Sequence, residues 1–214
     1  MPKSRRLSFR RATVRDIDAL VDHRHGMWTA IGHRTEAEIT EHDGRYRRWI
    51  RPRLRSGEVI GFVASSPDGE VVGSGMLWFR PDQPRPQVRT QVTPYILSMF
   101  TRDDWRGAGA ASGIVRRLVA ATRAAGHPSV VLHASEQGRS IYARLGFERT
   151  WEMRYWVDPV MRRERARWAR AAEEKRKKGL DRRVTRSRTH RTRSHSRPPR
   201  PRARRSGSSA RSAA

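Results

Sequence analysis

The pattern of hydrophobic and polar positions predicts alternating strands and helices up to about residue 158. Residues 7–12 alternate and predict a first strand, and capping boxes at Thr13 and Thr35 predict the starts of two helices. Two further strand-like runs are joined by Pro-Asp-Gly at 67–69, which predicts a hairpin. The first part of the chain is therefore expected to run strand, helix, helix, strand, strand.

The second part of the pattern centres on the short apolar run 96–100, which predicts a buried strand. A small-residue turn at 105–111 follows, and then a helix with one apolar face that stops at Gly126. Residues 129–147 predict a strand, a short helix and a turn, and the alternating run 148–157 predicts a last strand. The predicted order, β-α-α-β-β-β-α-β-α-β, indicates an α/β domain in which helices flank a sheet.

The strand, turn and helix start at 96–112 have the form of an anion site, because the first amides of a helix have no internal partner. A Walker loop would need a lysine, and this turn has none. The dinucleotide spacing G-x-G-x-x-G does not fit Gly107, Gly109 and Gly113. A purely structural helix cap is the other reading of these small residues.

Two motifs together resemble the GNAT superfamily of acyl-CoA-dependent N-acetyltransferases. The first is R-x-x-G-x-A at Arg106, Gly109 and Ala111, which resembles the pyrophosphate loop, and the second is Y-x-x-L-G-F from Tyr142 to Phe147. The resemblance spans residues 7–157 and is strongest over 95–147. It implies an acyl-CoA N-acyltransferase fold with a mixed, twisted sheet, acetyl-CoA as co-substrate, and acetyl transfer to a primary amine.

The resemblance also implies roles for individual residues. The backbone of Met99, Phe100 and Thr101 would bind the pantetheine arm, and Tyr142 would donate a proton to the departing thiolate. Ser135 stands where the family often has an Asn that helps to seat the cofactor. The pyrophosphate would be held by Arg106 and the loop amides, at Gly107, Ala108, Gly109, Ala110, Ala111 and Ser112.

The general base is less well determined by the sequence. His133 is the candidate, since its ordinary pKa near 6.5 suits proton removal from an ammonium through water, although a strand histidine also serves as a packing residue. Ser98 could orient the acceptor or simply pack. Four acidic residues of the second helix could attract a cationic amine or form a solvated face: Glu36, Glu38, Glu41 and Asp43.

Metal, membrane and disulfide chemistry are not expected. The chain has no cysteine, and the paired histidines His23 and His25 fall on different faces of a helix. No apolar run approaches the roughly 20 residues of a membrane span, and the beginning MPKSRRLSFRR lacks the apolar stretch of a signal peptide. These observations favour a cytoplasmic protein without a metal.

The charge of the chain is concentrated at its end. Residues 159–214 hold 21 Lys and Arg against 4 Asp and Glu, so +17 of the net charge of +26 lies there. We expect a GNAT domain over 1–158, a basic charged helix over 159–180 and an arginine-rich disordered tail over 181–214.

Such a tail could bind nucleic acid non-specifically, with the GNAT domain as a sensor or inactive scaffold. It could also reflect a GC-rich gene, because arginine outnumbers lysine 43 to 4. The acceptor, a small-molecule or peptide amine, and the oligomeric state are not determined by the sequence.

Overall fold

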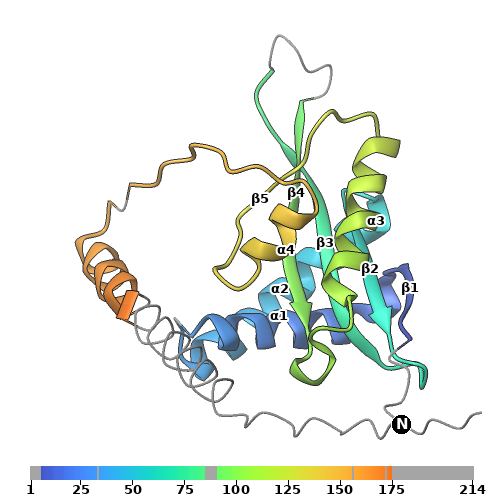
Figure 1. The fold of residues 1–214 in the computed structure, drawn as a ribbon, viewed down its shortest axis with the longest axis horizontal. Helices are drawn as coiled ribbons and strands as arrows, with labels where there is room; N and C mark the ends of the chain where they lie inside the picture. The colour runs from blue at the N-terminus through green and yellow to red at the C-terminus, as the bar shows by residue number, and fades with distance from the viewer. Residues whose placement is uncertain (1–5, 33, 85–90, 156, 172, 175–214) are drawn as a thin grey trace, which may run out of the picture. The chain divides into compact units, whose positions relative to one another are not determined.

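The computed structural model describes residues 6–32, 34–84, 91–155, 157–171 and 173–174. The chain divides into two compact units, Met1–Arg149 and Thr150–Ala214. In the first unit, helices cover both faces of a sheet (Figure 1). The domain boundary near residue 158 stays a prediction, and the predicted tail lies outside the described residues.

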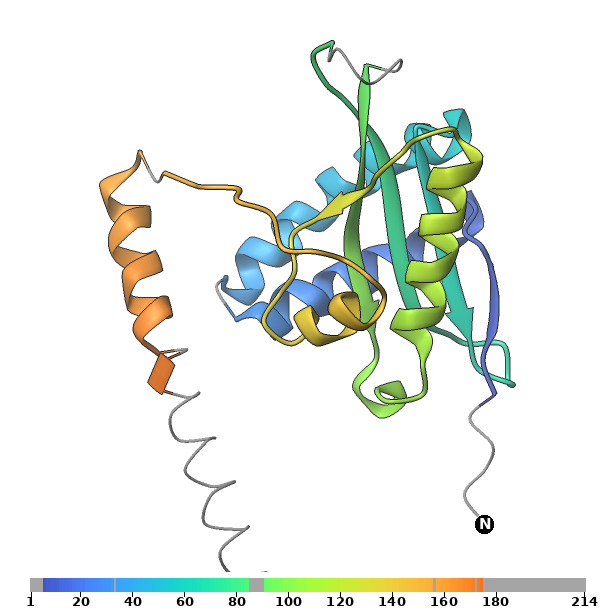
Figure 2. The same ribbon diagram turned by 45° about the horizontal axis from the view of Figure 1, so that its top comes forward.

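The sheet has five strands in the order β1-β2-β3-β4-β5. The first four are antiparallel neighbours, and β5 runs parallel to β4 (Figure 2). The turn at 67–69 joins β2 to β3 as predicted, and Gly69 there has φ +86°, a conformation that glycine adopts without strain. The strand bounds are Ser8–Arg11 for β1, Val59–Ser65 for β2, Val71–Pro81 for β3, Val92–Thr101 for β4 and Val131–Leu132 for β5.

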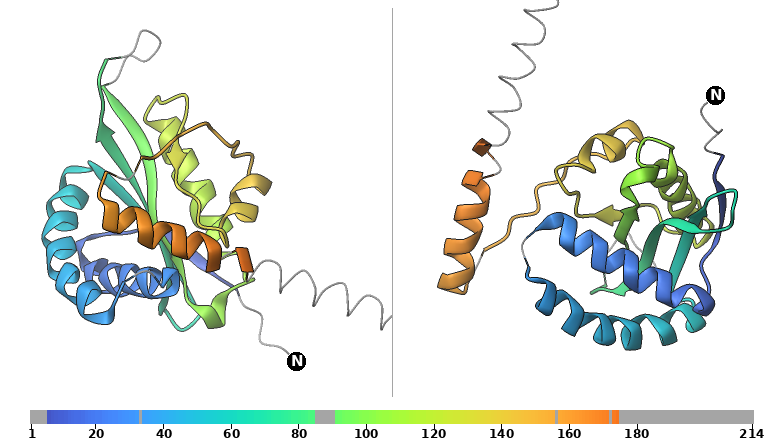
Figure 3. Two further views of the ribbon diagram at one scale, coloured as in Figure 1. Left: turned by 90° about the vertical axis from the view of Figure 1, so that its left-hand side faces the viewer. Right: turned by 90° about the horizontal axis from the view of Figure 1, so that it is seen from below.

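Helices α1 and α2 cover one face of this sheet, and α3 and α4 lie on the other (Figure 3). Both predicted capping boxes form, at Thr13 and at Thr35, and α2 ends at Gly57 with φ +78°. The helix bounds are Ile17–Ile31 for α1, Glu36–Ser56 for α2, Ala110–Ala124 for α3 and Arg139–Arg144 for α4, with short 3-10 turns at Val14–Asp16 (η1) and Asp103–Trp105 (η2).

The two faces of the sheet have separate hydrophobic cores. One packs α1 and α2 on the sheet and includes Leu20, Ile50 and Val63. The other packs α3 on the opposite face and includes Ile114 and Leu118, which are fully buried. Burying each such side chain stabilises the folded state by about 1.5–3 kcal/mol. This packing holds α3 on the sheet, and it therefore also holds the turn that directly precedes α3.

Gly113 lets α3 approach the edge of the sheet. A Cβ at this position would lie 2.3 Å from the ring of Phe9 in β1, and the guanidinium of Arg117 lies 4.1 Å from the centre of the same ring. Gly113 therefore has a packing role.

The last predicted strand, 148–157, is wrong in the part that the structure describes. Residues 148–155 form no strand, and the side chains that alternate there are exposed, with Trp151 95% and Met153 94% accessible. The sequence does alternate, but a strand also needs the edge of a neighbouring strand to pair with. The alternation does not show whether such an edge exists, and β5 is only two residues long.

Residues 159–171 are helical, and they lie within the range 159–180 of the predicted charged helix, whose bounds stay a prediction. Asp158 begins this helix, since its side-chain Oδ1 accepts from the amide of Val160 at 2.8 Å and its carbonyl accepts from Arg162 at 3.0 Å. Among the described residues, no helix is both long enough and apolar enough to cross a membrane.

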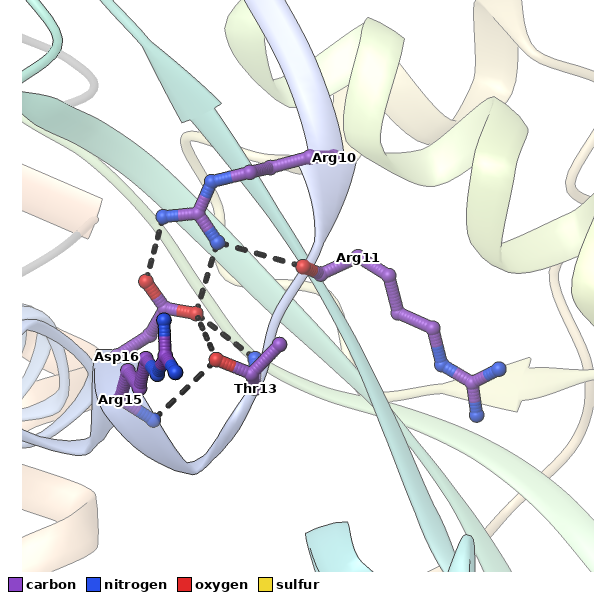
Figure 4. Close-up of polar contacts among 5 residues, drawn as sticks. All are labelled: Arg10, Arg11, Thr13, Arg15 and Asp16. Atoms are coloured by element: carbon purple, nitrogen blue, oxygen red, sulfur yellow. Dashed lines mark hydrogen bonds and ion pairs between the residues drawn. The ribbon is translucent and has the colours of Figure 1, made fainter.

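The link from β1 to α1 is fixed by a carboxylate at its centre (Figure 4). Asp16 is 7% exposed and receives two hydrogen bonds from the Arg10 guanidinium, at 2.6 and 2.8 Å. Its Oδ2 also accepts from the amide of Thr13 at 2.7 Å. Burial raises the pKa of Asp16, but the Arg10 hydrogen bonds, the Thr13 amide and the Arg10 charge together outweigh that effect, so the pKa is lowered.

We predict that Asp16→Asn lowers the free energy of unfolding by about 1–3 kcal/mol at pH 7, because Arg10 loses its anionic partner. The folded pKa lies below the unfolded value of about 3.9, so this stabilisation is complete above that value and is lost as the pH falls through the folded pKa. Denaturant unfolding at pH 7 and pH 3 should show the difference between the two proteins shrinking in acid. Asp18→Asn is the control, since Asp18 makes an exposed ion pair with Arg47. An equal loss in both variants contradicts the prediction.

Candidate active site

β4 and β5 run side by side only briefly and then part. Tyr95 pairs with Val131 and Ile96 with Leu132, whereas the pairing of β4 with β3 continues to Thr101. Beyond Ile96, the outer edge of β4 has no paired strand in the described part of the chain. Backbone donors and acceptors on such an edge are free to bind an extended ligand.

A bulge lies within this open stretch of β4. Ser98 has φ +50°, and the register with β3 shifts between Ser74 and Met76. A non-glycine residue with positive φ is uncommon and costs free energy, so the surrounding structure must hold it in place. Bulges redirect the backbone, and this one immediately precedes the three residues predicted to bind the cofactor.

Those three residues, Met99, Phe100 and Thr101, are consecutive in β4 and lie along its open stretch. The Met99 side chain packs over β3, where a Cβ on Gly75 would lie 2.2 Å from its sulfur. Phe100 packs against α1, with its ring centre 5.0 Å from that of His23. Thr101 Oγ1 is buried without a hydrogen-bond partner among the described residues. The backbone edge beside it fits a pantetheine arm, whose amides can pair with an open strand edge.

The turn between β4 and α3 presents several amides without acceptors. Gly107 and Gly109 have φ of +80° and +89°, and a Cβ on either would meet no atom within 4 Å. The amide of Gly113 bonds to the carbonyl of Gly109 at 2.9 Å. Helix geometry therefore leaves the preceding amides, at Ala110, Ala111 and Ser112, without partners inside the helix. Residues 107–109 of the turn lack bulky side chains and precede the positive end of α3, which suits a pyrophosphate.

Arg106 is at this turn but is held by a neighbour. Its Nη2 lies 2.7 Å from Asp103 Oδ1, and its amide donates to the Asp103 carbonyl at 3.2 Å. The pair is exposed, so it contributes little to stability. The guanidinium can leave Asp103 for a phosphate at small cost.

The Y-x-x-L-G-F motif is explained by the way α4 ends. The amide of Phe147 donates to the carbonyl of Tyr142 at 3.1 Å, and the amide of Gly146 donates to Ala143 at 3.1 Å. Gly146 has φ +89°, and the rings of Tyr142 and Phe147 contact edge to face at 5.8 Å. These are the two bonds, the left-handed glycine and the apolar contact of a Schellman helix end.

The Tyr142 ring is partly enclosed by the start of its own helix. A Cβ on Gly138 would lie 3.0 Å from Tyr142 Cε2, so glycine leaves room for the ring. Burial raises the pKa of Tyr142, because it disfavours the phenolate. The phenol therefore stays protonated at neutral pH and can act as a proton donor.

His133 and Ser135 follow the point at which β5 leaves β4. His133 Nδ1 contacts the hydroxyl of Tyr95, and their ring centres lie 5.7 Å apart. Ser135 Oγ accepts from the amide of Gly138 at 3.1 Å, so the serine stabilises the turn before α4. The cofactor role of Ser135 and the base role of His133 stay predictions.

The acidic residues of α2 mostly have partners within the protein. Glu38 belongs to the capping box of Thr35, and Glu41 pairs with Arg45 at 3.1 Å. Glu36 and Asp43 each bind one ring nitrogen of His25, at 2.7 Å.

The histidines of α1 have different environments. The hydrogen bonds that His25 donates to Asp43 and Glu36 raise the pKa of His25, whereas burial lowers the pKa of His23, whose Nδ1 lies 2.9 Å from Ser74 Oγ. Within the described residues, no three His, Asp or Glu side chains gather in an arrangement that could hold a metal ion.

Sequence reasoning missed two side chains on this side of the sheet, Arg24 and Tyr46. Tyr46 is 7% exposed and occupies an apolar position of α2, so the pattern predicted only packing. The guanidinium of Arg24 lies 4.6 Å from the centre of the Tyr46 ring. No local signal marks such a contact, because the two residues are on different helices.

Comparisons with known proteins agree on one family. Residues 17–147 match the acetyltransferase (GNAT) family. A glucosamine 6-phosphate N-acetyltransferase from Trypanosoma brucei brucei is 30% identical over 95 residues, which are 44% of this chain and 63% of that protein. The chain thus spans somewhat less than two thirds of that relative.

Solved structures share the fold. A GCN5-related N-acetyltransferase from Ralstonia eutropha aligns with a TM-score of 0.65 and 26% identity, covering 71% of this chain and 99% of that one. A predicted acetyltransferase from Clostridium acetobutylicum, solved with acetyl-CoA, aligns with a TM-score of 0.64 and 25% identity, covering 71% and 96%. The family match covers more than half of the chain and agrees with the parted strands and the open turn described above. The chain therefore belongs to the acetyltransferase (GNAT) family.

Proposed function

We propose that this protein transfers an acetyl group from acetyl-CoA to a primary amine. The observation that carries the proposal is the combination of an open β4 edge with a turn of unpartnered amides at its end. An extended thioester with a charged pyrophosphate matches both features. The family match supports the same reaction.

In this proposal the chain holds the cofactor through its backbone. The amides of 107–112 and the Arg106 guanidinium bind the pyrophosphate, and the Ala108 amide leaves the Trp105 carbonyl, to which it donates at 3.3 Å, in order to do so. The edge at Met99, Phe100 and Thr101 binds the pantetheine arm, and an amide there polarises the thioester carbonyl. The amine nitrogen forms a bond to the carbonyl carbon, and the carbon–sulfur bond breaks.

Two protons then have to move. The departing thiolate takes the phenolic proton of Tyr142, which burial keeps in place at neutral pH. The proton lost by the amine goes to a base, for which His133 is our candidate. The cytoplasmic location inferred from the sequence stays a prediction. The family match does not support the nucleic-acid alternative, and the tail on which it depends lies outside the described residues.

We predict that saturating acetyl-CoA raises the melting temperature and that Gly109→Glu abolishes this shift. A ligand at about 100 times its Kd stabilises the folded state by about 2.7 kcal/mol, which corresponds to roughly 5–10 °C for a domain of this size. The glutamate would bring a side chain and a negative charge into the turn, on a backbone with φ +89°.

Gly69→Glu is the matched control, since Gly69 also has a positive φ and open space around it but lies in the β2–β3 turn. Thermal unfolding with and without ligand distinguishes them. An undiminished shift in Gly109→Glu contradicts the cofactor assignment.

We predict that Tyr142→Phe lowers kcat by about 10²–10⁴-fold, the usual contribution of a general acid, with little change in acetyl-CoA affinity. Phenylalanine keeps the contact with Phe147 and loses only the hydroxyl. Turnover by thiol release and cofactor affinity by calorimetry should be measured on one preparation. Tyr155→Phe serves as the control, because that tyrosine is 76% exposed. An unchanged kcat would assign Tyr142 to packing alone.

A further inference from the structure

Three buried polar atoms without partners lie on the helical face that carries α1 and α2. They are Arg24 Nη1, Asp43 Oδ1 and Tyr46 Oη, and each is inaccessible and lacks a hydrogen bond within the described residues. More than nine tenths of buried polar groups in proteins are satisfied. A guanidinium nitrogen, a carboxylate oxygen and a phenol that are all unsatisfied in one region therefore call for a polar partner that the described residues do not supply.

The three groups form one cluster. The Arg24 guanidinium lies 4.6 Å from the centre of the Tyr46 ring and 5.7 Å from that of Trp28, so two aromatic faces hold it in place. Asp43 and Tyr46 are three residues apart on α2 and share a face of that helix. Burial lowers the pKa of Arg24, and the electrostatic effects of Tyr46 and Asp43 oppose this shift only in part.

Asp43 is oriented by its other oxygen. Its Oδ2 lies 2.7 Å from His25 Nδ1, and the second ring nitrogen of His25 lies 2.7 Å from Glu36 Oε1. The histidine thus links α1 to two points on α2. This arrangement fixes the carboxylate while Oδ1 stays without a partner.

The cluster adjoins the open stretch of β4. The Tyr46 hydroxyl lies beside Ser98, the bulged residue before Met99, without meeting hydrogen-bond geometry. α1 crosses the same strand, since a Cβ on Gly26 would lie 2.9 Å from the Phe100 ring. A ligand bound by Arg24, Asp43 and Tyr46 is therefore next to the backbone that binds the thioester in our proposed function.

We propose that these three residues form the acceptor subsite, and that it selects an amine that carries an anionic group, a carboxylate or a phosphate. This inference rests on the proposed function and deepens it. The planar guanidinium of Arg24 pairs with the anion, for which its geometry is suited. Asp43 Oδ1 accepts from an ammonium or hydroxyl group of the same molecule, and Tyr46 bonds to either. A purely cationic amine would satisfy Asp43 but would be repelled by Arg24.

The test compares matched amines on the unmodified full-length chain. L-Serine and ethanolamine differ by a carboxylate, and glucosamine 6-phosphate and glucosamine differ by a phosphate. We expect kcat/KM, measured by thiol release from acetyl-CoA, to favour the anionic member of one pair by about 10–100-fold, the usual effect of a charged hydrogen bond. The pair with the larger ratio identifies the anion.

Arg24→Met should remove this preference by raising KM for the anionic amine by a similar factor, with little effect on its uncharged counterpart. Arg51→Met, at an exposed position of the neighbouring helix α2, should change neither. If Arg24→Met does not fold, Arg24→Lys, which keeps the charge but loses the two-pronged contact, should reduce the preference in part.

Acetylation of ethanolamine and glucosamine as efficient as that of their anionic counterparts overturns the inference and leaves the acetyltransferase function intact. Acetyl-CoA binding without acetylation of any amine overturns the proposed function, and the acceptor subsite with it.

Discussion

The site depends on the limited pairing between β4 and β5. A strand in the middle of a sheet normally has both edges hydrogen-bonded, and β4 keeps this arrangement only at Tyr95 and Ile96. After that point β3 still holds one edge, while the other is open and bulged at Ser98. The open edge of β4 follows from this separation, because a longer β5 would have paired with the residues after Ile96. The turn of 107–112 follows the end of this open strand along the chain.

Burial on the two faces holds this open arrangement in place. Ile114 and Leu118 fix α3 to one face, so the amides at its start point from a rigid helix. On the other face, Phe100 packs under α1, and His25 ties α1 to α2 through two carboxylates. Ligand groups at this site would meet backbone and side chains that are already positioned, which reduces the entropy lost on binding.

The sequence predicted most of the fold, because the signals for its turns and helix ends are local, whereas the cofactor-binding residues stay predictions. The turn before α3 and the Schellman end of α4 are each written in a few adjacent residues, and both capping boxes formed. The strand expected at 148–157 failed because a strand depends on a partner edge elsewhere in the chain. Arg24, Asp43 and Tyr46 could not be recognised as a cluster for the same reason, since the contact between α1 and α2 is not encoded in either helix alone.

Hydrogen exchange of individual backbone amides, with and without coenzyme A, shows whether the turn before α3 and the open edge of β4 bind the cofactor. We expect the amides of Gly107, Ala110, Ala111 and Ser112 to exchange rapidly in the free protein and to slow when the ligand binds. The amide of Gly113, which already bonds to Gly109, should change much less. Binding of coenzyme A with no slowing at 107–112 or along 99–101 would show that the cofactor binds elsewhere on the protein.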